Sequence, residues 1–197
     1  MKTSRLMCLL LPVLSLSCAE SGGPVYVDAQ WNLTCPADRE VDCGSLADIP
    51  CLGSGGRRAI VGEHRQELCG YPIIGICEAV KRADGARIVS LQVDLGGKFG
   101  FELMGATIDT GGDVVEQLAC NVTITEDQVR YNLGACGRET PSMMQPCQLS
   151  DVSVEGSDVV FGLECRSLIS DTTEAGFDVA AVGGGPTTIR FANCVGF

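Results

Sequence analysis

Apolar and polar residues alternate one by one along most of the chain after residue 76, and this period of two constrains the fold more than any other feature of the sequence. Successive side chains of an extended strand point to opposite faces, so the alternation predicts strands with one buried face. Short runs rich in glycine, aspartate and serine separate the alternating segments and favour tight turns. This part of the sequence therefore predicts a series of antiparallel hairpins.

The register of each hairpin follows from its turn residues and from the requirement that apolar residues face each other across the two strands. The predicted turns are Asp84-Gly85, Leu95-Gly96-Gly97, Glu126-Asp127, Gly156-Ser157 and a loop around Gly184. In the same order, the predicted cross-strand pairs are Val80 with Val89, Val93 with Phe99, Ile124 with Val129, Val154 with Val159, and Val179 with Ile189. These registers place the paired apolar side chains on one face of each hairpin.

A set of hairpins with one apolar face needs a second sheet to cover that face. We therefore expect a mainly β fold in which antiparallel hairpins form a β-sandwich, with a β-barrel as the alternative. Residues 79–197 form the predicted antiparallel β domain. Residues 31–78 contain half of the cysteines that follow Cys18 and few periodic segments, so we expect a Cys-rich, loop-rich segment packed on that domain.

Ten cysteines follow Cys18, an even number that suits five disulfides in an oxidising compartment. The candidate disulfide residues are Cys35, Cys43, Cys51, Cys69, Cys77, Cys120, Cys136, Cys147, Cys165 and Cys194. Cys120 and Cys136 bracket one predicted hairpin, and Cys147 and Cys165 bracket the next, which makes each pair a candidate bridge. In the registers given above, however, neither pair is directly opposite, and bridged cysteines must lie close together.

The chain starts with a short cationic segment, which an uncharged apolar stretch follows from residue 6 to residue 14. Two serines, Ser15 and Ser17, then stand just before Cys18. This arrangement is typical of a secretory signal peptide over residues 1–17. The apolar stretch is too short to span a bilayer, which needs about 20 apolar residues.

The signal region resembles that of a bacterial lipoprotein, in which a small residue precedes the cysteine that receives the lipid, although Ser15 stands where that pattern prefers leucine. The resemblance implies that Cys18 carries acyl chains and inserts them into a lipid bilayer, at the outer membrane or the cell surface. Residues 18–30 then form a tether between this anchor and the folded part. A periplasmic or extracellular soluble protein without lipid is the alternative.

The formal net charge of −11 at pH 7 disfavours binding to nucleic acids, whose charge has the same sign. His64 is the only histidine, and its polar neighbours indicate a surface position rather than a catalytic one. The closely spaced cysteine pairs of zinc sites and the glycine patterns of nucleotide-binding loops do not occur. Residues 109–113 could supply oxygen ligands to calcium but are predicted to form a plain turn. We therefore expect no catalytic residues, no metal and no cofactor.

We expect a non-enzymatic, disulfide-stabilised surface lipoprotein with a structural or interaction role, whose partner is an unknown protein or glycan. The alternative is a secreted glycan- or protein-binding module without a lipid anchor. A hydrolase that uses two carboxylates is a third hypothesis, for which no pair stands out among 25 acidic residues. Trp31 and Tyr71 could form a sugar-stacking platform, although core packing is the default for both side chains.

Overall fold

The computed structural model of the protein describes residues 23–34, 57–109, 111, 114–116, 120–138, 140–170 and 176–197. The regular elements of these residues are all strands, which confirms the mainly β fold. The strands are β1 (Tyr26–Thr34), β2 (Arg57–Glu63), β3 (Glu67–Leu68), β4 (Tyr71–Lys81), β5 (Arg87–Leu95), β6 (Phe99–Ile108), β7 (Val114–Glu116), β8 (Asn121–Glu126), β9 (Val129–Gly137), β10 (Cys147–Glu155), β11 (Asp158–Ile169), β12 (Gly176–Ala180) and β13 (Thr187–Ala192).

Several predictions concern residues outside the described ranges. These are the signal peptide over residues 1–17, lipidation at Cys18, and the disulfides of Cys35, Cys43 and Cys51. β1 begins at Tyr26, within the segment predicted as a tether, because buried and half-buried side chains already alternate there. β2, β3 and most of β4 come from the segment predicted to be loop-rich, and they belong to the same sheet as the later strands.

All the described strands belong to one mixed sheet of 13 strands. Along its main path the order is β12-β1-β13-β11-β10-β9-β8-β6-β5-β4-β3, while β2 pairs with β1 and β7 pairs with β6. The pairs are antiparallel except for β9 and β10, which pair in parallel where Cys136 lies beside Cys147. The hairpins β4–β5, β5–β6, β8–β9 and β10–β11 correspond to predicted ones. The parallel step joins the two halves of the sheet.

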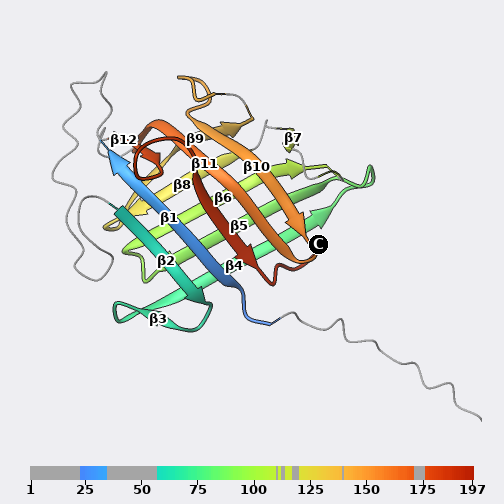
Figure 1. The fold of residues 1–197 in the computed structure, drawn as a ribbon, viewed down its shortest axis with the longest axis horizontal. Helices are drawn as coiled ribbons and strands as arrows, with labels where there is room; N and C mark the ends of the chain where they lie inside the picture. The colour runs from blue at the N-terminus through green and yellow to red at the C-terminus, as the bar shows by residue number, and fades with distance from the viewer. Residues whose placement is uncertain are drawn as a thin grey trace, which may run out of the picture.

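The two halves of the sheet face each other across the core. In Figure 1, β1, β10, β11 and β13 form one layer that crosses over a second layer of β4, β5, β6 and β8. Phe101 of the second layer lies 5.9 Å from Phe161 and 6.4 Å from Phe191 of the first, measured between ring centroids. Aromatic and branched aliphatic side chains thus fill the space between the layers, as the alternation predicts.

Two of the predicted registers are shifted by two residues. Val93 pairs with Phe101 instead of Phe99, and Ile124 pairs with Tyr131 instead of Val129. In both hairpins the predicted length of the loop is correct, but the loop lies one residue further along the chain. A shift of two residues keeps every side chain on its predicted face, so the same residues are buried.

The first predicted hairpin is wrong by one residue. Val80 pairs with Ile88, and Ala79 pairs with Val89, because the loop between the strands holds one more residue than a two-residue turn. The carboxylate of Asp84 accepts a hydrogen bond from the backbone N–H of Ala86 and stabilises this longer loop. As a consequence Val80 points outward and is 66% exposed.

The predicted turn at Gly156 is confirmed, with Val154 opposite Val159. The predicted hairpin around Gly184 is wrong, because β12 and β13 do not pair with each other. Both strands run antiparallel to β1 and to β11. They therefore lie end to end between β1 and β11. Phe177, Val179, Ile189 and Phe191 are buried in this arrangement, as they would be in a hairpin. The apolar pattern therefore does not distinguish between the two topologies.

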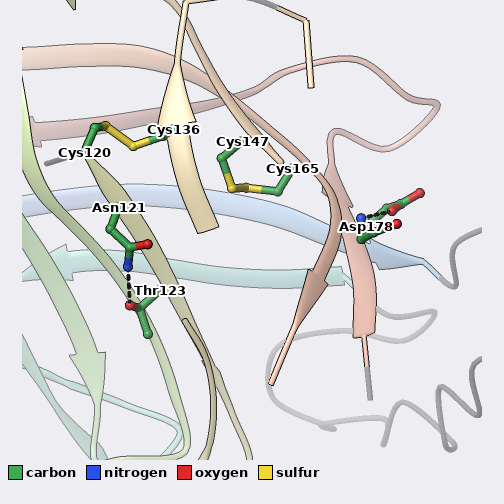
Figure 2. Close-up of a disulfide and its surroundings, with 8 residues drawn as sticks. Cys120, Asn121, Thr123, Cys136, Cys147, Cys165 and Asp178 are labelled. Carbon is green, nitrogen blue, oxygen red and sulfur yellow. Dashed lines mark hydrogen bonds between the residues drawn. A yellow bond between two sulfur atoms is a disulfide. The ribbon is translucent and has the colours of Figure 1, made fainter. Parts of the chain in front are cut away.

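Two disulfides link neighbouring strands near the middle of the strand order, and Figure 2 shows them side by side. Cys120 is bonded to Cys136 and Cys147 to Cys165, which confirms both candidate bridges. A β-bulge in β10 brings Cys147 directly opposite Cys165, and a second bulge in β9 brings Cys136 beside Cys120. In a regular ladder without the bulge, the two cysteines of each pair would be one residue out of register.

A third disulfide joins Cys77 of β4 to Cys194, which follows β13. The next residue, Val195, accepts a hydrogen bond from the backbone N–H of Ala79 and donates one to the carbonyl oxygen of Cys77. These contacts cover part of the free edge of β4 with the last residues of the sequence. Cys69 also takes part in a disulfide.

Candidate ligand-binding groove

A groove of about 480 Å³ lies on the outward face of the layer formed by β5, β6, β8 and β9. Residues from neighbouring strands meet there in one row, in which Asp94 pairs with Gly100, Gly100 with Thr125, and Thr125 with Arg130. Gly100 has no side chain, so the floor of the groove stays open between Asp94 and Thr125. The polar side chains that line the groove are Gln92, Asp94, Glu102, Thr125, Gln128 and Arg130.

Hydrogen bonds hold three charged side chains of the groove in place. Arg130 donates from Nη2 to Oε2 of Glu102 at 2.7 Å. The two carboxylate oxygens of Asp94 accept from the backbone N–H of Gly97 at 3.0 and 3.2 Å, which anchors Asp94 to the loop between β5 and β6. The groove thus offers oriented carboxylates together with a guanidinium group.

Lys98 is the last residue of this loop. The predicted register places Lys98 opposite Asp94, but in the structure Asp94 pairs with Gly100. The ammonium group of Lys98 donates to Oδ1 of Asp127, in the turn between β8 and β9. This hydrogen bond and the negative charge of Asp127 raise the pKa of Lys98 above its ordinary value. The ion pair links the two loops at one end of the groove and is exposed to solvent.

Tyr71 borders the groove at the same end. A Cβ atom at Gly96 would lie only 2.8 Å from Cδ1 of Tyr71, so the ring rests on the loop between β5 and β6. The side chain remains 37% exposed. Trp31, its predicted companion in a sugar-stacking platform, is 1% exposed and belongs to the core. The structure therefore separates the two aromatic residues and leaves only Tyr71 near the groove.

The groove also has an aliphatic border on β4. Ile74 pairs with Asp94, and Ile76 pairs with Gln92, which lies opposite Glu102. The groove therefore continues onto this strand. The two isoleucines are partly exposed, at 39% and 38%. A ligand in the groove would meet carboxylate, amide, hydroxyl and guanidinium groups on the floor and apolar side chains at the border.

The other predicted candidates lie elsewhere and have structural contacts. Nδ1 of His64 accepts a hydrogen bond from the backbone N–H of Gly75 at 3.2 Å, at the edge of β4. Oδ1 of Asp109 accepts from the backbone N–H of Gly111 at 2.7 Å, which is the hydrogen bond of a turn. Within the described ranges, no group of three or more histidine, cysteine, aspartate or glutamate side chains is placed to hold a metal ion.

The residues of the groove were not predicted to form a site. A usable signal existed, since Gln92, Asp94 and Glu102 occupy the outward positions of two predicted strands. The two-residue error in register, however, placed Phe101 opposite Leu91 instead of Val93 and so moved Glu102 away from Gln92. Only the correct register aligns these side chains with Arg130 on β9.

Comparisons with protein-family models, with curated proteins and with solved structures find no match for this chain. No helix among the residues that the structure describes is long and apolar enough to cross a membrane. The buried disulfides are compatible with an extracellular or periplasmic location, because such bonds are rare in a reducing cytosol.

Proposed function

We propose that this protein is an exported, disulfide-stabilised binding module that holds a glycan in the groove beside Gly100 and catalyses no reaction. An acyl group on Cys18 anchors it to a lipid bilayer at the outer membrane or the cell surface. In the alternative form of the proposal, the same module is secreted without an anchor, and the groove has the same role.

The observation that carries this proposal is the chemistry of the groove. Sugars present many hydroxyl groups, which both donate and accept hydrogen bonds, together with apolar C–H faces. Asp94 and Glu102 supply acceptors, Arg130 supplies donors, and the amides of Gln92 and Gln128 supply both. The volume of about 480 Å³ lies within the range of ordinary small-ligand sites.

The border of the groove supports a glycan over a charged small molecule. Tyr71 can stack against the C–H face of a sugar ring, because an aromatic ring offers a broad apolar surface with a polar tip. Ile74 and Ile76 extend this apolar border along β4. A small, strongly charged ligand would leave these side chains without a role.

A glycan array followed by calorimetry on the best ligand tests the proposal. Glu102→Gln and Arg130→Ala each break the ion pair on the floor of the groove, and each is expected to weaken binding by at least tenfold, about 1.4 kcal/mol. Arg190→Ala is the matched control, because Arg190 forms a similar exposed ion pair with Asp158 at 2.6 Å on the other layer. The proposal fails if no glycan binds, or if the control weakens binding as much as the groove variants do.

The anchor needs a separate experiment. Cells that express the protein are grown with a fatty-acid analogue, and the mature protein is expected to carry the label. Cys18→Ser should abolish labelling and release the protein into the soluble fraction. Labelling that persists in Cys18→Ser, or its absence from the unaltered protein, excludes the anchor without affecting the groove.

A further inference from the structure

Asp94 gives the groove a negative charge that no cation of the described chain neutralises. Among the residues that the structure describes, none forms an ion pair with this carboxylate. Lys98, which ends the same loop, pairs instead with Asp127, at 2.5 Å between Nζ and Oδ1. The N–H group of Gly97 bonds to both oxygens of Asp94 but carries no net charge. The groove therefore has one uncompensated anionic position.

The carboxylate of Asp94 is oriented and still open to a ligand. The side chain is half-buried, and the two contacts with the N–H group of Gly97 fix the plane of the carboxylate. An ionised carboxylate has about four lone-pair sites, so most of its capacity to accept hydrogen bonds remains. An acceptor that is already held in place binds a donor with a smaller loss of side-chain entropy.

The other charged groups of the floor compensate each other. Glu102 and Arg130 form an ion pair at 2.7 Å, so together they offer polar atoms without a net charge. Asp94 lies opposite Gly100 on the neighbouring strand, which makes Glu102 its diagonal neighbour, and such neighbours lie about 7–8 Å apart. A single sugar ring with its substituents can span the two positions. The floor thus suits a ligand with a cation at one side and hydroxyl groups at the other.

Apolar surface lies directly beside the anionic position. Ile74 is the cross-strand partner of Asp94 and is partly exposed. The ring of Tyr71 rests on Gly96, in the loop that Asp94 anchors. A metal ion or a simple ammonium ion would leave this apolar surface uncovered, whereas a sugar ring that bears an amino group presents C–H faces next to its cation. The net charge of −11 favours the approach of cationic ligands and disfavours that of acidic sugars.

We propose that the groove selects glycans with free amino groups, an inference that rests on the proposed glycan-binding function and specifies its ligand. The ammonium group of an amino sugar donates hydrogen bonds to the carboxylate of Asp94, and neighbouring hydroxyl groups bond to the ion pair of Glu102 and Arg130. An acetyl group on the same nitrogen removes the positive charge, so N-acetylated sugars bind more weakly. Asp94 is therefore the residue that determines specificity.

Chitosan tetrasaccharide and chitin tetrasaccharide are the matched probes, because they differ only in the acetyl group on each nitrogen. Calorimetry with the exported protein at about pH 6, where amines are protonated and carboxylates are ionised, measures both affinities. The chitosan form is expected to bind at least tenfold more tightly, which is the scale of one hydrogen bond between charged groups. Added salt should reduce this ratio of affinities, since it screens the attraction between partly exposed charges.

Asp94→Asn removes the charge but keeps a side-chain oxygen that can accept from the N–H group of Gly97. The ratio of chitosan to chitin affinity is expected to fall to roughly twofold or less in this variant. Asp151→Asn is the matched control, because Asp151 is exposed on β10 in the other layer and its substitution changes the net charge by the same amount. The ratio should stay at least tenfold in the control, since a distant exposed charge is largely screened.

The outcomes separate this inference from the proposed function. Equal binding of the two tetrasaccharides, or a ratio that persists in Asp94→Asn, overturns the preference for amines, whereas binding that Glu102→Gln still weakens leaves the groove a glycan site. Failure of every glycan to bind overturns both proposals. A ratio that falls as far in Asp151→Asn as in Asp94→Asn assigns the preference to net charge and overturns the role of Asp94. Tetralysine has ammonium groups but no sugar ring, and binding as tight as that of the chitosan form would assign the groove to basic peptides and overturn the inference.

Discussion

At the scale of single residues, one added methyl group at Gly134 is expected to destabilise the fold. A methyl group on Gly134 would overlap the carbonyl oxygen of Val122 and would lie 2.8 Å from Cδ1 of Leu168. The backbone cannot move away without breaking the ladder between β8 and β9. Gly134→Ala is therefore expected to lower the free energy of unfolding by roughly 2–3 kcal/mol, measured by chemical denaturation.

Gly156→Ala is the matched control for this prediction. Gly156 lies in the turn between β10 and β11 with a φ angle of 62°, and no other atom lies within 4 Å of a Cβ at that position. Only backbone strain opposes the substitution, at a cost of about 1 kcal/mol. If both variants lose the same free energy of unfolding, steric overlap at Gly134 is not the cause of the destabilisation.

The residues of the candidate groove show what can be predicted at this scale. Alternation assigned Gln92, Asp94 and Glu102 to outward positions, and all three are partly exposed. Their assembly into one site depends on contacts across strands, which the pattern of a single strand does not contain. For the same reason, the role of Gly100 as the floor of the groove was not predicted.

At the scale of strands, turn chemistry predicts the length of the loop but not its position in two of the hairpins. The hairpins β5–β6 and β8–β9 have loops of the predicted length that are displaced by one residue. The predicted pairs assumed regular ladders, whereas β6, β9 and β10 each contain a bulge. An extra residue in one strand changes the register beyond it, and the apolar pattern alone does not reveal where the residue is inserted.

The edge of β4 gives a prediction at this scale. The backbone N–H of Gly75 points away from β5 and donates to Nδ1 of His64. His64→Ala removes this acceptor, so hydrogen–deuterium exchange at Gly75 is expected to become at least tenfold faster, with a loss of about 1 kcal/mol in stability. Because the side-chain oxygen of asparagine can take the place of Nδ1, His64→Asn should retain slow exchange. Unchanged exchange in His64→Ala would contradict the proposed role of this histidine.

At the scale of the whole molecule, the three described disulfides differ in how far apart in the sequence their cysteines lie. Cys120–Cys136 and Cys147–Cys165 span 16 and 18 residues and each staple one hairpin whose strands already pair. Cys77–Cys194 spans 117 residues and ties β4, near one end of the strand order, to the segment that follows β13, near the other end. It therefore restrains the relative position of the two layers that enclose the core.

This difference predicts a ranking of stabilities. A disulfide restricts the unfolded chain more when it closes a longer loop, so the double variant Cys77→Ala/Cys194→Ala should lose about 4–5 kcal/mol. The double variant Cys147→Ala/Cys165→Ala should lose about 3 kcal/mol, since its loop is short. Denaturation of both variants in parallel, with the other disulfides intact, measures the difference. An equal or smaller loss for the long-range disulfide would mean that strand pairing alone holds the layers together, and that Val195 suffices to cover the edge of β4.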